Sequence, residues 1–220
     1  MNTNNLDLES YFKALNDNKK MDTFHRGNFL SRIFGIFNEE PVRIWCRNKN
    51  SQYIDLGRPT YHLKKPKNRY YTYDFLFEKD GKRYVVEQKC EIAYQNYKYL
   101  KLTTGKYLEH HEKKKSFKEF VKMAKTPSFY KVSYKDKSQD NRKNTVGIHG
   151  TILIWGSIEN QEKDDPISKL IEKYNFVDIL SLERIISDLI KWEDKEYFDF
   201  LKKRQEIINS FFTFLKGGNI

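Results

Sequence analysis

Two acidic side chains fall at a spacing that predicts a metal site on a β-hairpin. Residues 70–91 contain two β-rich runs separated by Asp80 and Gly81, a dipeptide typical of type I′ turns because both central residues need a positive φ. A two-residue loop places Asp74 directly opposite Glu87, with Cβ atoms about 5 Å apart, where two carboxylates repel each other. A hard cation between them would remove the repulsion, and Mg²⁺ is commonly held by one or two carboxylates with water and phosphate oxygens.

The alternation of side chains puts Lys89 on the same face as the two carboxylates. That face also carries Thr72, Leu76 and Val85. The opposite face is expected to belong to the core, and it reads Tyr73, Phe75, Phe77, Tyr84, Val86 and Cys90. An exposed sheet face with cross-strand ion pairs is the alternative interpretation, but such a face normally sets opposite charges against each other.

These groups indicate metal-assisted hydrolysis of a phosphodiester. Asp74 and Glu87 are expected to hold Mg²⁺, with the main-chain carbonyl of Gln88 as a further ligand and Mn²⁺ as a substitute ion. Lys89 is expected to orient or deprotonate the attacking water and to offset charge on the phosphorane. We therefore assign the catalytic role to Asp74, Glu87 and Lys89.

An Asp on one strand followed by Glu-x-Lys on the next resembles the PD-(D/E)xK nuclease superfamily, which includes many type II restriction endonucleases and repair nucleases. Tyr73 stands where the name-giving Pro would be. The resemblance covers about residues 22–180. It implies an α/β (α+β) fold with a restriction-endonuclease-like core of order αβββαβ, in which helices flank a mixed four- to five-stranded sheet. In that family an acidic residue of the first helix often assists the metal, which makes Glu39 or Glu40 a candidate ligand.

Hydrophobic periodicity predicts the other elements. Helices are expected at 24–38, 92–103, 106–126, 166–174, from 181 onward and at 194–215. Strands are expected at 42–46, 129–134, 151–155 and 176–179, and loops at 48–69 and 135–145. The helix at 92–103 would be the second helix of the core, and the strand at 151–155 would be its fourth strand.

Length and composition predict one soluble unit. We expect a single nuclease domain over residues 1–220, with its core at about 22–180 and a C-terminal helical extension at about 181–216. Apolar runs fall short of the ~20 residues of a membrane span, and the first residues lack a signal-peptide pattern. The expected location is therefore cytoplasmic, without a membrane partner. Cys46 and Cys90 are expected to be reduced core residues.

The charge distribution favours nucleic acid as the partner. The formal net charge is +11, and residues 106–143 hold twelve Lys or Arg against five Asp or Glu. Residues 159–200 reverse the balance, with six against twelve. Such segregation suits a polyanion, although a solvated lysine-rich face explains the basic stretch equally well. The candidate nucleic-acid contacts are Arg58, Tyr97, Lys98 and Lys101.

The sequence as a whole predicts a Mg²⁺-dependent endodeoxyribonuclease of the type II restriction endonuclease-like class. Double-stranded DNA is the expected substrate, and an enzyme cutting both strands would be a homodimer. Three alternatives stay open: a catalytically inactive DNA-binding or scaffold module of the same fold, a repair nuclease and an RNA nuclease.

Overall fold

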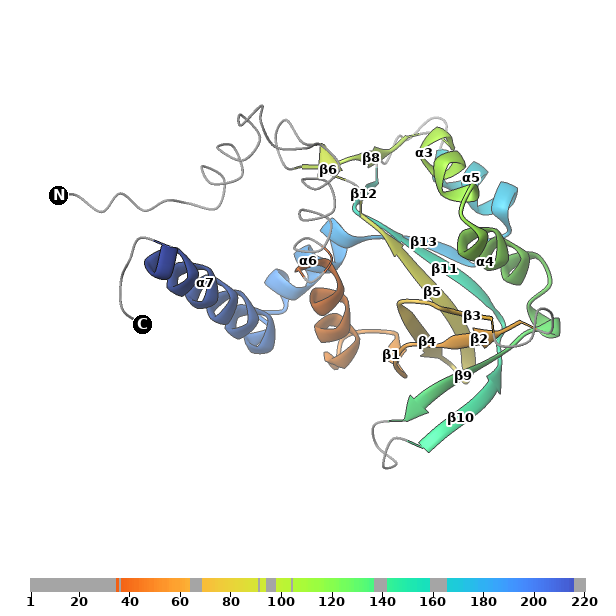
Figure 1. Ribbon diagram of the computed structural model, residues 1–220, viewed down its shortest axis with the longest axis horizontal. Helices are drawn as coiled ribbons and strands as arrows, with labels where there is room; N and C mark the ends of the chain where they lie inside the picture. Colours follow the sequence, from red (N-terminus) through yellow and green to blue (C-terminus); the bar gives the residue numbers. More distant parts are fainter. Residues whose placement is uncertain are drawn as a thin grey trace.

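A mixed five-stranded sheet forms the centre of the molecule in the computed structural model, which describes residues 35, 37–63, 69–90, 92–93, 98–103, 105–136, 142–158 and 166–215. Its strands are, in spatial order, β1 (Ile54–Asp55), β4 (Phe75–Lys79), β5 (Lys82–Lys89), β11 (Gly150–Trp155) and β13 (Asp178–Ser181) (Figure 1). β1, β4 and β5 are antiparallel neighbours, whereas β11 and β13 continue parallel to β5. The chain is therefore a mixed α/β protein, as the sequence predicts.

The β4–β5 hairpin has the predicted register. Asp80 and Gly81 both have positive φ, 52° and 73°, as a type I′ turn requires. The ladder pairs Phe75 with Val86 at one end and Lys79 with Lys82 at the other. Because this register is fixed by the turn, the residue just before β4 lies across from the last residues of β5.

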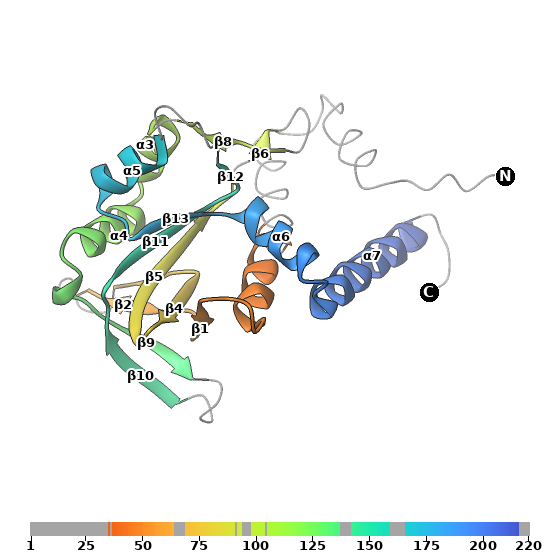
Figure 2. The same cartoon turned by 180° about the vertical axis from the view of Figure 1, so that it is seen from behind.

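Helices cover both faces of the central sheet, as Figures 1 and 2 show from opposite sides. α3 (Lys106–Glu112), α4 (Lys115–Lys125) and α5 (Pro166–Tyr174) pack on one face, together with Leu76, Val85 and Leu153. A helix at 37–47, α6 (Leu182–Lys191) and the start of α7 (Lys195–Leu215) pack on the other face. Phe75, Phe77 and Val86 lie in this second cluster.

A second sheet of four antiparallel strands lies beside the first, in the order β10-β9-β2-β3. Its strands are β2 (Thr60–His62), β3 (Tyr70–Thr72), β9 (Lys131–Asp136) and β10 (Arg142–Gly147). The loop expected at 135–145 is therefore wrong for its described residues, which belong to β9 and β10. Val132 and Val146 face the α4 side of the core, and this burial favours strand pairing over a loop. The predicted loop at 48–69 likewise contains β1 and β2.

Tyr73 departs from the face that strict alternation predicts. It packs against Phe120 of α4, with ring centroids 5.8 Å apart, and its hydroxyl donates to the main-chain oxygen of Ser116 at 3.3 Å. The chain bends at Asp74 between β3 and β4, so the alternation of β4 does not extend back to Tyr73. The chain passes at this bend from one sheet to the other.

The strand predicted at 42–46 is wrong, because these residues belong to the helix at 37–47. A short apolar run is compatible with both the helical and the strand periodicity. Val42 and Trp45 are buried one turn apart against the central sheet, and Arg43 pairs with Glu39 one turn back at 3.3 Å. Pro41 lies within the helix and does not end it. The first strand is β1, and the part of the predicted helix before residue 35 lies outside the described residues.

The helix predicted at 92–103 is also wrong for its described residues. They form short strands instead, which are β6 (Ile92–Ala93), β7 (Lys98–Tyr99) and β8 (Lys101–Leu102). Tertiary partners fix the extended chain, since β8 pairs with β12 (Ser157–Ile158) and Trp155 donates to the Leu100 carbonyl at 2.7 Å. The helices that the structure describes between β5 and β11 are α3 and α4. They divide the predicted basic helix at 106–126, which is followed by a 3₁₀ turn at Pro127–Phe129.

The remaining predicted elements are present. β11, α5, β13, α6 and α7 lie within a few residues of the expected positions. α7 projects away from the sheets (Figure 1), with Tyr197 and Phe200 buried near its start and Phe198 and Ile207 exposed. The homodimer expected from the sequence stays a prediction. Cys46 and Cys90 are free thiols, and Cys46 lies on the helix at 37–47. Within the described residues, no helix combines the length and apolarity needed to cross a membrane.

Phe120 provides a test of this packing. Its ring is fully buried between Tyr73, Phe117 and Phe176. We expect Phe120→Ala to lower the free energy of unfolding by about 3–5 kcal/mol, measured by urea denaturation, because it removes apolar contacts and leaves a cavity. Phe129 is 80% exposed, so Phe129→Ala is a matched control with an expected change within about 0.5 kcal/mol. Equal effects of the two substitutions would contradict the described core.

Candidate active site

The four predicted site groups meet where β5 ends beside the start of β4. Asp74 Oδ2 accepts a hydrogen bond from the Gln88 main-chain N–H at 2.8 Å. Lys89 Nζ lies 2.5 Å from Glu87 Oε1 and donates to the Gln88 carbonyl oxygen at 3.2 Å. The structure therefore brings Asp74, Glu87 and Lys89 together beside the main chain of Gln88.

The pleat of β5 explains why these groups share a face. Glu87 and Lys89 are two residues apart and stand beside Leu153 and Trp155 of the parallel strand β11. The Gln88 side chain points to the opposite face, where its Nε2 donates to the Asn38 carbonyl at 3.1 Å. Glu87 and Lys89 therefore face the candidate site, whereas the Gln88 side chain faces the helix at 37–47.

The site is shielded from solvent on most sides. The side chains of Glu87, Asp74 and Lys89 are 10%, 17% and 22% exposed. The pKa of Glu87 is raised to about 7, mainly because the carboxyl is buried; Lys89 opposes the shift and the Asp74 carboxylate adds to it. Burial alone would lower the pKa of Lys89, but the carboxylates of Glu87 and Asp74 outweigh it and raise this pKa above its usual value. Lys89 is therefore a charged ammonium that pairs with Glu87 and is also attracted by the charge of Asp74.

The donor set fits a hard divalent cation that keeps open positions. Two carboxylates and one main-chain carbonyl supply only oxygen, which is the ligand type that Mg²⁺ prefers. Among the described residues, no three His, Cys, Asp or Glu side chains gather into a complete protein site. Mg²⁺ does not require one, because it commonly retains waters and binds substrate phosphates as well. The Glu87 carboxylate, which is costly to ionise in the buried site, would gain a second counter-charge.

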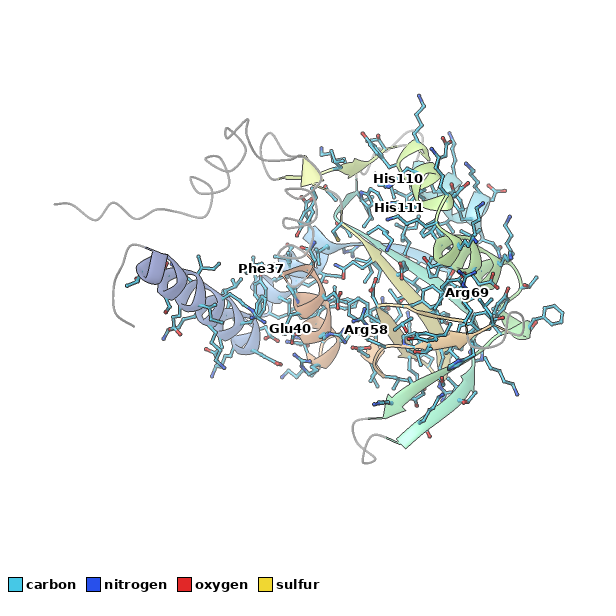
Figure 3. All side chains as sticks on the ribbon, in the orientation of Figure 1. Phe37, Glu40, Arg58, Arg69, His110 and His111 are labelled. Carbon is cyan, nitrogen blue, oxygen red and sulfur yellow. The ribbon has the colours of Figure 1, made fainter. Side chains whose placement is uncertain are left out.

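The loop that follows β1 holds Arg58 beside Asp74, and Figure 3 shows Arg58 near the strands. Leu76 exchanges hydrogen bonds with this loop, since its N–H donates to the Gly57 carbonyl and its carbonyl accepts from Leu56, each at 2.8 Å. Gly57 has φ +115°, a conformation that glycine adopts without strain. Arg58 Nη2 lies 3.5 Å from Asp74 Oδ1, and the Arg58 side chain is 53% exposed. This predicted phosphate contact is therefore at the mouth of the site.

A cleft of about 540 Å³ adjoins Arg58. Sequence reasoning missed this cleft, because its walls come from strands distant in the chain. The strand predicted at 129–134 corresponds to one wall, β9, but its pairing with β2 and β10 was not predicted. The lining residues are Arg43, Gly57, Arg58, Thr60, His62, Tyr70, Thr72, Ser133, Tyr134, Lys135 and Lys143.

The structure does not bring the other candidates into the cluster. Glu39 pairs with Arg43 at 3.3 Å, and Glu40 pairs with Arg47 at 3.1 Å, so their described partners are arginines of their own helix. Figure 3 shows Glu40 on that helix. Lys101 lies exposed on β8 and Lys98 lies on β7, so the expected helical groove is not formed. Tyr97 lies outside the described residues.

No protein-family model, curated protein or solved structure matches this chain. Function is therefore inferred from the geometry of Asp74, Glu87 and Lys89 and from the surfaces around them.

The raised pKa of Glu87 predicts a pH dependence of stability in the metal-free protein. Between the ordinary carboxyl pKa and about 7, the folded state holds a proton on Glu87 that the unfolded chain releases, so stability falls as pH rises through this window. Glu87→Gln removes this titration. We expect its free energy of unfolding, measured in EDTA, to gain roughly 1–3 kcal/mol relative to wild type between pH 5 and pH 8.

Glu78→Gln is the matched control, because it removes a carboxylate that pairs with Arg83 on the same hairpin. A constant difference between Glu87→Gln and wild type across this pH range would contradict the buried environment described for Glu87.

Proposed function

We propose that this protein is a Mg²⁺-dependent endonuclease that hydrolyses DNA phosphodiester bonds. The observation that carries the proposal is the convergence of Asp74, Glu87, the Gln88 carbonyl and Lys89 at the end of β5. Two buried acids beside one charged lysine form an arrangement that suits a divalent cation and a phosphate better than it suits a simple ion pair.

The order of elements supports a restriction-endonuclease-like core. When only the helices and the strands of the central sheet are considered, a helix at 37–47 is followed by β1, β4 and β5, then by α3 and α4, and then by β11. This is the αβββαβ order that the resemblance to PD-(D/E)xK nucleases implies. The strands β2, β3 and β6–β10 are inserted between these elements. The site lies on the hairpin of the second and third strands, which is where the Asp and Glu-x-Lys pattern should fall.

Asp74, Glu87 and the Gln88 carbonyl would hold the ion. When bound, Mg²⁺ supplies Lewis acidity to the scissile phosphate and lowers the pKa of a coordinated water. The role of Lys89 follows from its charge. Because the carboxylates of Glu87 and Asp74 raise its pKa, Lys89 Nζ donates hydrogen bonds to the attacking water and to the phosphate oxygens rather than accepting a proton.

Arg58 contributes a second positive charge at the site entrance. Its guanidinium is half exposed and only loosely paired with Asp74 at 3.5 Å, so it can exchange that contact for a phosphate. A guanidinium can bind two phosphate oxygens at once, which fixes the orientation of the backbone.

Asp74→Asn and Lys89→Ala test the proposal on supercoiled plasmid with Mg²⁺ or EDTA. We expect Asp74→Asn to abolish both cleavage and Mg²⁺ binding by calorimetry. Lys89→Ala should slow cleavage about 10²–10³-fold, the usual loss when one group that stabilises transition-state charge is removed, and should leave DNA binding near the wild-type level. Lys82→Ala is the matched control, because Lys82 lies exposed at the other end of β5.

Wild-type cleavage rates in both site variants would disprove the assignment. DNA binding by the wild-type protein without Mg²⁺-dependent nicking would instead support the alternative of a catalytically inactive binding module.

A further inference from the structure

The four-stranded sheet has one face in the core and one face in the cleft. Tyr61, Tyr71, Val132 and Val146 pack against the α4 side of the core. Because side chains alternate along each strand, their neighbours in sequence stand on the opposite face. These neighbours, which we call the outer face, are Thr60, His62, Tyr70, Thr72, Ser133, Lys135, Lys143 and Thr145. All but Thr145 also line the cleft.

Two lysines oppose each other directly on the outer face. Lys135 of β9 pairs with Lys143 of β10 in the antiparallel register, and both side chains are exposed. Like charges placed directly opposite destabilise a sheet. Arg43 and Arg58 also line the cleft, where Arg43 pairs with Asp55 at 3.0 Å and Arg58 lies 3.5 Å from Asp74, and the described lining includes no Asp or Glu. An anionic ligand would relieve this repulsion, just as a cation would relieve the repulsion between Asp74 and Glu87.

Two aromatic rings lie beside the lysines. His62 and Tyr70 are cross-strand partners with ring centroids 5.9 Å apart, and Tyr70 is 59% exposed. Lys143 Nζ lies 3.4 Å from His62 Nε2, so a cation and two rings share one patch. Exposed rings interleaved with cations suit unpaired bases, because a base can stack on a ring while its phosphate meets an ammonium.

The outer face is continuous with the candidate active site. Thr72 lies on this face two residues before Asp74, and Arg58 both lines the cleft and contacts Asp74. A volume of about 540 Å³ is in the range of pockets that enclose one small molecule, so it suits one or two nucleotides rather than a duplex.

We propose that the outer face binds a single-stranded segment of nucleic acid, with phosphates at Lys135 and Lys143 and a base on Tyr70. The strand then leads past Arg58 to the Asp74–Glu87 site. The delivery of the strand for cleavage rests on the proposed function, whereas its binding does not. The substrate of the cleft is therefore an unpaired strand, in contrast with the double-stranded DNA expected from the sequence.

The test is fluorescence anisotropy of the full chain in EDTA, with a short fluorescein-labelled oligothymidylate and with a duplex of matched length as competitor. We expect the double variant Lys135→Gln/Lys143→Gln to bind more weakly. The slope of log K against log salt concentration should become shallower by about 1.4, because each phosphate contact on a single strand contributes about 0.7 to that slope. Tyr70→Ala should weaken binding about tenfold at an unchanged salt slope, and Tyr70→Phe should restore it.

Lys118→Gln/Lys125→Gln is the matched control, because it removes the same charge from exposed positions on α4, outside the cleft lining. We expect it to bind within about twofold of wild type. Wild-type affinity in the Lys135/Lys143 and Tyr70 variants, or stronger binding of the duplex, would overturn the inference. Single-strand binding that depends on these residues without Mg²⁺-dependent cleavage would support the inference and disprove the proposed function. Mg²⁺-dependent cleavage together with binding that these variants leave unchanged would support the proposed function and overturn the inference.

Discussion

The repulsion between two buried carboxylates is the constraint on which the candidate site depends. The register of the hairpin, which its turn sets, places Asp74 just before β4 and Glu87 near the end of β5, and the Gln88 N–H holds the Asp74 carboxylate beside that end. In the metal-free protein Lys89 pairs with Glu87, and the half-exposed Arg58 and the Gln88 N–H contact Asp74. Burial is the main cause of the raised pKa of Glu87, and the charge of Asp74 adds to it. If these two positions served only the stability of the fold, a pair of apolar side chains would make the protein more stable than two carboxylates do.

The junction of the two sheets converts this local constraint into an accessible site. The chain bends at Asp74 as it leaves β3 and enters β4. The bend carries Tyr73 into the core under α4 and leaves Asp74 at the boundary. The loop that carries Arg58 is hydrogen-bonded to the same stretch through Tyr73 and Leu76. One segment of backbone therefore positions the candidate active site, Arg58 and the cleft. The packing of Tyr73 under α4 stabilises that segment.

Local signals in the sequence predicted those parts of the molecule that local chemistry decides. The turn at Asp80 and Gly81 fixed the hairpin register, and with it the meeting of Asp74, Glu87 and Lys89. The run at 151–155 is apolar on both faces and lies between Gly150 and Gly156, which favours the buried strand that the structure has there. In contrast, 42–46 fits both helical and strand periods, and only its packing against β4 and β11 decides between them.

The cleft could not be predicted because long-range pairing builds it. Thr60 meets Ser133 across more than seventy positions of sequence, and no local pattern encodes that contact. Likewise, the segment near Lys101 is extended because Trp155 and β12 hold it. The basic character of 106–143 was readable, but which of its lysines face the cleft depended on strands that propensity alone placed in a loop.

The most direct test of the central claim is anomalous diffraction from crystals of the wild-type protein soaked in Mn²⁺, which can replace Mg²⁺ at oxygen-rich sites. The account predicts an anomalous peak about 2 Å from a carboxylate oxygen of both Asp74 and Glu87, with the Gln88 carbonyl beside it. A peak bound elsewhere, with Glu87 still paired only to Lys89, would contradict the account. So would carboxylates too far apart to share one ion.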